Sequence, residues 1–202
     1  MQFTTFALAA FSLGSAIAAP VVGDLPAFTD ALTAVGNVKT IVETQVATIT
    51  TLTQGTPAGD SVTKIEASLL TVGQNVNGLL GPLLALANNP AAPISASQLS
   101  SVPQLVSDCQ AIVEGVRTVG KTVVKGLGQD ALNQVQPELQ WVLSTAGPVV
   151  KPLVSFTTTA VPGTSAVFEQ VNSGLAQIQG LANSLIVTPV NGVLGGVLGG
   201  LL

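Results

Sequence analysis

The sequence predicts an all-α protein: an antiparallel bundle of about five amphipathic helices, some of them kinked at glycine or proline. Apolar residues recur at intervals of three and four along several stretches, which is the pattern of one face of an α-helix. The strict alternation typical of strands is scarce. Breaks rich in glycine and proline divide the chain into pieces of helical length. The core should consist of Val, Leu and Ala, since only 3% of the residues are aromatic.

The first helix is predicted over Phe28–Gln54, where apolar residues form a single stripe. Lys39 and Glu43 are spaced as an i,i+4 pair, and we expect them on the outer side of this helix. Its many threonines lower the helix propensity, so packing must hold it in place.

A second helix should follow the glycine- and proline-containing break at 55–59 and continue to Asn88. Asp60 or Ser61 is the expected N-cap. We expect a bend near Gly81-Pro82, because a proline within a helix removes a backbone hydrogen bond.

A long helix is predicted over Val102–Leu127, with a start as early as Ser97, and the other helices should surround it. Its apolar stripe has spacings of four, three, four, three and four: Leu105, Cys109, Ile112, Val116, Val119 and Val123. Its other side is predicted to be charged: Asp108, Glu114, Arg117, Lys121 and Lys125. The last three residues are spaced to lie in one row, either a solvated face or a cationic strip for lipid head groups or an acidic polymer.

The remaining helices are expected to be shorter. One further turn is predicted over Asp130–Val135, and a fourth helix from Pro137 toward Ser144. Gly147-Pro148 and Pro152 should kink or divide the region 147–157. The hydroxyl-rich stretch from Thr157 to Gly163 is interpreted as a connector that offers acceptors for O-linked sugars. The fifth helix is predicted over Ser165–Leu185.

Three parts are expected along the chain. Residues 1–18 have the apolar core and the Ala16-Ile17-Ala18 pattern of a secretory signal peptide, residues 22–185 form the helical domain, and residues 186–202 are an uncharged Gly/Leu/Val-rich tail. Three interpretations of this tail stay open: an apolar secreted tail, which is favoured, a lipid-anchor attachment signal, and a helix that packs in a membrane through Gly195 and Gly199.

Composition argues against most catalytic chemistry. The chain contains no histidine, which removes Ser-His-Asp and Cys-His nucleophiles and His-ligated metal sites. Charged residues make up 8% of the chain and the net charge is −4, so the basic footprint of a nucleic-acid-binding protein is absent. We therefore expect no enzymatic activity, no cofactor and no metal. The single cysteine, Cys109, is interpreted as a small core residue, with a reactive thiol as the alternative.

The apolar stripes could also hold a ligand, because helices rich in Val, Ala and Leu with few aromatics leave room for an acyl chain between them. The residues predicted to line such a slot lie on the third and fifth helices: Leu105, Cys109, Ile112, Val116, Val119, Val171, Leu175 and Ile178.

Three segments, FTDALTAVGNVKTIVETQVATI, DCQAIVEGVRTVGKTVVKGL and FEQVNSGLAQIQGLANSL, carry a family resemblance that extends over roughly residues 22–185. The chain resembles the hydrophobic surface-binding protein A family, which is similar to the ligand-binding modules of fungal cell-wall galactomannoproteins. The resemblance implies an all-α bundle that is secreted or associated with the cell wall, adsorbs to hydrophobic solids, recruits secreted hydrolases to them and, in some members, captures fatty acids. It brings no catalytic residues. The glycine-rich tail and the low charge depart from commoner members, which leaves free secretion or anchoring open.

We therefore expect a secreted, non-enzymatic fungal protein that binds hydrophobic surfaces or lipids. Two alternatives are a fatty-acid carrier with a cavity between its helices and a structural cell-wall mannoprotein.

Overall fold

A computed structural model describes residues 24–55, 59–89, 94–163, 165 and 167–185. These residues form an all-α bundle, as predicted. Its helices are α1 (Pro26–Leu52), α2 (Gly59–Gly78), α3 (Leu80–Ala87), α4 (Ala96–Gly126), α5 (Gln129–Ala160) and α6 (Phe168–Leu185). The predicted signal peptide and the apolar tail lie outside the described residues, so their interpretations stay predictions.

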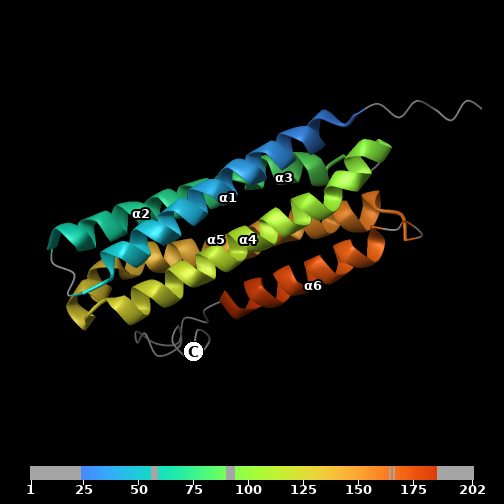
Figure 1. The fold of residues 1–202 in the computed structure, drawn as a ribbon. Coiled ribbons are helices and arrows are strands. Elements are labelled where there is room, and N and C mark those ends of the chain that lie inside the picture. The colour runs from blue at the N-terminus through green and yellow to red at the C-terminus, as the bar shows by residue number, and fades with distance from the viewer. Residues whose placement is uncertain (1–23, 56–58, 90–93, 164, 166, 186–202) are drawn as a thin grey trace, which may run out of the picture.

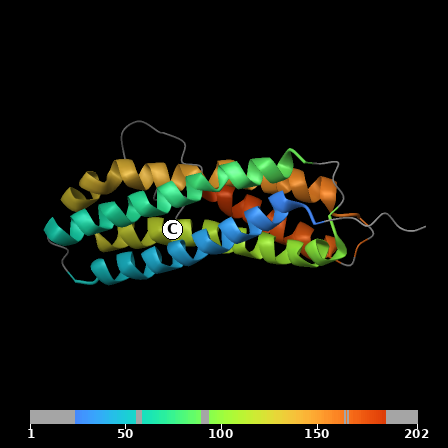
Figure 2. The ribbon, with the colours of Figure 1, turned by 90° about the horizontal axis from the view of Figure 1, so that it is seen from above.

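Helix α3 continues in the direction of α2, and every other pair of consecutive helices runs antiparallel (Figures 1 and 2). Helices α1, α4 and α6 therefore point one way, while α2, α3 and α5 point the other. Helices α4 and α5 form the middle of the bundle. Both contact helices on either side of them. Among the described helices, α6 packs only against α4 and α5, at one edge of the bundle. Helix α4 therefore lies at the centre of the bundle, as predicted, but it shares this position with α5.

Helix α4 begins with a capping box that the sequence also encodes. Ser95 is the N-cap: its side chain accepts a hydrogen bond from the backbone N–H of Gln98, and the Gln98 side chain accepts one from the backbone N–H of Ser95. This satisfies two backbone donors at the helix start. The Ser-x-x-Gln spacing in the sequence indicates that this helix starts at Ala96, one residue before the predicted start at Ser97.

The interruption of the second predicted helix lies at Leu79, between the end of α2 at Gly78 and the start of α3 at Leu80, and not at Gly81-Pro82 as expected. Proline disturbs the turn before it, because it cannot donate to the carbonyl four residues earlier and its ring crowds that carbonyl. For Pro82, that carbonyl belongs to Gly78. The predicted caps Asp60 and Ser61 lie within the first turn of α2.

The largest correction concerns α5. The predicted separate turn, short fourth helix and kinked segment form one continuous helix of 32 residues, with Pro137, Pro148 and Pro152 inside it. Each proline removes one helical hydrogen bond, but the helix buries a broad apolar face, and Pro152 itself belongs to that face. The supposed connector at Thr157 is also helical. Thr157 is 2% exposed, so it is no acceptor for a sugar in this fold, whereas Thr158 and Thr159 are exposed and their glycosylation stays a prediction.

The remaining boundaries differ little from the prediction. Helix α1 begins and ends two residues earlier than expected, and α6 begins at Phe168 rather than Ser165. Glycines allow close contacts between helices. A Cβ on Gly73 would lie within 3.0 Å of the Trp141 ring, so α2 and α5 approach each other closely there.

Candidate functional site

All eight residues predicted to line a ligand slot are buried in the common core, with exposed fractions of at most 5%: Leu105, Cys109, Ile112, Val116, Val119, Val171, Leu175 and Ile178. They come from α4 and α6, which pack against each other. The structure therefore places these side chains together as core. Their role in ligand binding stays a prediction.

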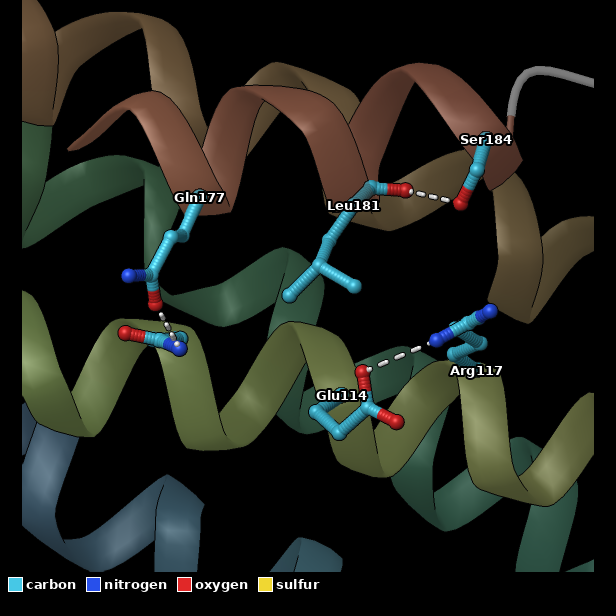
Figure 3. A network of polar contacts seen from close by, with 6 residues as sticks. Glu114, Arg117, Gln177, Leu181 and Ser184 are labelled. Carbon is cyan, nitrogen blue, oxygen red and sulfur yellow. Dashed lines mark hydrogen bonds and ion pairs between the residues drawn. The ribbon is translucent and has the colours of Figure 1, made fainter. Parts of the chain in front are cut away.

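Helices α4 and α6 run parallel along their contact, and two pairs of residues show which parts of them lie side by side. The Gln110 side-chain amide donates to the Gln177 Oε1 at 2.8 Å, and one turn earlier Gly174 faces Val106. Figure 3 shows this contact, with Leu181 of α6 projecting toward α4. A Cβ on Gly174 would lie within 3.0 Å of a Val106 methyl group, so the two backbones approach closely at this point.

Arg117 lies on the same face of α4 as Gln110, seven residues further along, and the register places it level with the end of α6 (Figure 3). Its Nη1 is 3.5 Å from Glu114 Oε2. Its Nε is buried without a hydrogen-bond partner among the described residues. The predicted row of three cations is therefore not a uniform solvated strip: Arg117 and Lys121 are half-buried, and Lys125 is exposed.

A groove of about 450 Å³ lies between α5 and α6. Its lining residues are Gly147, Val150, Lys151, Val154 and Ser155 of α5, and Gln179, Ala182 and Asn183 of α6. None of the eight residues predicted to line a ligand slot is among them. This groove was not predicted from the sequence, because its α5 half belongs to the region that the prolines were expected to break.

Lys39 reaches across to α4 instead of pairing with Glu43 on its own helix. Its Nζ is 2.8 Å from Asp108 Oδ1. Asp108, predicted on the charged outer side of α4, is only 6% exposed. The hydrogen bond to Asp108 and the negative charge of that carboxylate raise the pKa of Lys39 above its ordinary value of 10.5.

The chain segment before α1 is bound to the start of α4. The Gln98 side chain accepts from the Leu25 backbone N–H and donates to the Leu25 carbonyl, both at 2.9 Å. Next to it, Ser95 Oγ donates to Asp24 Oδ1 at 2.6 Å. We call these contacts, together with the Lys39–Asp108 ion pair, the α1 clasp.

Cys109 is a core residue, in agreement with its interpretation. Its side chain is 2% exposed. Burial, and to a lesser extent the negative charge of Asp108, raises the pKa of its thiol to about 12. The thiolate is the reactive form of cysteine, so this side chain is unreactive near neutral pH.

No group of three or more His, Cys, Asp or Glu side chains that could hold a metal ion occurs within the described ranges. Within the part of the chain that the structure describes, one stretch, Gly59–Ala87, is long and apolar enough to cross a membrane, with a mean hydropathy of 1.3 in its best window. Buried helices of soluble bundles pass the same test, and this stretch packs against α1 and α5. Comparison of the chain with family models, curated proteins and solved structures returned no match.

Proposed function

We propose that this protein is a secreted, non-enzymatic binder of hydrophobic surfaces or lipids. The observation that carries the proposal is the scarcity of charged residues. Charged groups strongly oppose removal from water, and only 16 of 202 residues are charged. The mean hydropathy of +0.61 is correspondingly high. The resemblance to the hydrophobic surface-binding protein A family supports the same function.

The threonines of α1 strengthen this argument. The exposed side chains of Thr40, Thr44 and Thr48 each donate to the carbonyl four residues earlier, at 2.8–3.1 Å. Their hydroxyl donors are thus already satisfied within the helix. Covering this surface with an apolar phase therefore leaves no donor of these side chains unpaired, and its cost is lower than the number of hydroxyls suggests.

Depletion of the protein from solution onto polyester film or hexadecane droplets tests the proposal. We expect adsorption by the full chain, driven by apolar area leaving water, and weaker adsorption by a chain lacking residues 186–202. A highly charged helical protein of similar size is the control. Absence of adsorption by both forms would contradict the proposal.

A fatty-acid carrier is the second candidate, and the α5–α6 groove favours it. Pockets for small ligands usually have volumes of about 300–1,000 Å³, and this groove combines an apolar floor at Val150 and Val154 with the exposed ammonium group of Lys151. Native mass spectrometry with dodecanoate should then show one bound molecule per chain. Lys151→Gln should weaken that complex, whereas Lys125→Gln should not.

A further inference from the structure

We propose that α6 opens as a unit from α4 and α5, and that the apolar faces exposed on both sides form the contact with an apolar surface. The opening is a property of the fold. Only the contact with the surface rests on the proposed function. Three features of the described residues distinguish α6 from the other helices.

The first feature is its position at the edge of the bundle. Helix α6 contacts only α4 and α5, whereas the other long helices, α1, α2, α4 and α5, each contact three or more helices. It is also the last described helix, so its departure pulls no other described element with it. Helices α2 and α3, by contrast, are joined to their neighbours in the chain at both ends.

The second feature is the scarcity of polar contacts. Within the described part of the chain, α6 is linked to another helix by one side-chain hydrogen bond, between Gln110 and Gln177, and by no ion pair. Helix α1 is also terminal among the described helices, but the α1 clasp holds it, in part through the buried side chains of Gln98 and Asp108. Separation of α6 therefore leaves few polar groups without partners.

The third feature is incomplete packing along both contacts of α6. The groove of about 450 Å³ separates it in part from α5. At its contact with α4, the Nε of Arg117 is buried without a partner among the described residues. Opening would allow water to reach this N–H, which removes part of the cost of an unsatisfied buried donor.

Opening would expose apolar side chains on both faces. Helix α6 buries Val171, Leu175, Ile178, Ala182 and Leu185 on one side, and its only charged residue is Glu169. The opposing face includes Val106 of α4 and Val150 of α5. A helix with such an apolar face binds well at an apolar–water interface, so an apolar surface would stabilise the open state.

Two engineered disulfides, one that ties α6 to α4 and a matched control that ties α1 to α4, test whether α6 opens. A Cβ on Gly174 would lie 3.9 Å from the Cβ of Val106, and a Cβ on Gly115 would lie 3.7 Å from that of Val42. Both distances suit a disulfide, whose Cβ atoms are about 3.8 Å apart. In a Cys109→Ala background, Val106→Cys with Gly174→Cys ties α6 to α4, and Val42→Cys with Gly115→Cys ties α1 to α4.

Hydrogen exchange in solution tests the opening itself. In the wild-type chain, amides of residues 171–182 should exchange together, and faster than those of residues 105–119 in α4. Oxidation of the α6 disulfide should slow their exchange by roughly 100-fold, since it closes a long loop. Oxidation of the α1 disulfide should not change it. Equal exchange of α6 and α4 in the wild-type chain would overturn the proposal, even if the variants fail to fold.

Adsorption to hexadecane droplets tests the contact. Oxidation of the α6 disulfide should lower the initial adsorption rate about tenfold relative to the reduced form. This corresponds to an increase of about 1.4 kcal/mol in the activation free energy of adsorption. The α1 disulfide should have no effect. Equal adsorption by both forms of the α6 variant would refute the role of opening. If no variant adsorbs while α6 exchanges as expected, the proposed function fails and the opening stands.

Discussion

The two terminal helices of the described bundle, α1 and α6, both lie parallel to α4, yet they are held in different ways. Helix α1 is fixed by an ion pair between half-buried Lys39 and buried Asp108, and by a side-chain amide that bonds both backbone groups of Leu25. Among the described residues, helix α6 is held to its neighbours by apolar packing and by one exposed side-chain hydrogen bond. Apolar packing is non-directional, whereas buried polar groups lose their partners when helices separate. The comparison thus indicates which end of the bundle can open.

Loss of Gln98 should have the largest effect on stability. Gln98→Ala removes both hydrogen bonds to Leu25 and part of the α4 capping box, and we expect a decrease of about 2–4 kcal/mol in the free energy of unfolding. Gln177→Ala, the matched change at the α6 contact, should cost less than about 0.5 kcal/mol. Urea unfolding measures both. Similar losses in the two variants would invalidate the contrast between α1 and α6.

Lys39→Met should have the next largest effect. It leaves the buried Asp108 carboxylate without its cation and should lower the free energy of unfolding, whereas Lys125→Met at an exposed position of α4 should be nearly neutral. Folding raises the pKa of Lys39, so its stabilisation is complete below the unfolded pKa and is lost as pH rises through the folded pKa.

The wild-type chain and Lys39→Met should therefore differ by a constant free energy from neutral pH to near the ordinary lysine value of 10.5, and by less above it. Urea unfolding at a series of pH values measures this difference. A difference that grows with pH in the alkaline range would mean that the ion pair is not its source.

Two glycines of α6 should give the smallest effects, with opposite signs. Gly174→Ala inserts a methyl group against Val106 and should cost about 1 kcal/mol after the gain in helix propensity. No atom lies within 4 Å of a Cβ on Gly180, so Gly180→Ala should stabilise by up to about 1 kcal/mol. Thermal unfolding of the two variants shows whether each substitution stabilises or destabilises the protein. Stabilisation by Gly174→Ala would show that α6 packs less closely on α4 than described.

The features that could be predicted from the sequence depend on neighbouring residues within a few helical turns. The apolar spacing from Leu105 to Val123 follows the helical period, so it indicated both the helix and its buried face. Cys109 was placed in the core for the same reason. The capping box at Ser95 was equally local, and its spacing was available in the sequence.

Features that depend on distant residues became visible only in the tertiary structure. The i,i+4 spacing favoured Glu43 as the partner of Lys39, but packing of α1 on α4 brings Asp108 closer, 69 residues away. The prolines of α5 predicted breaks, but burial along a 32-residue face outweighs the hydrogen bonds that they remove. The groove beside α6 depends on this continuous α5. Local periodicity therefore determined the helices and their faces, while long-range packing decided which helix is fixed and which is free to open.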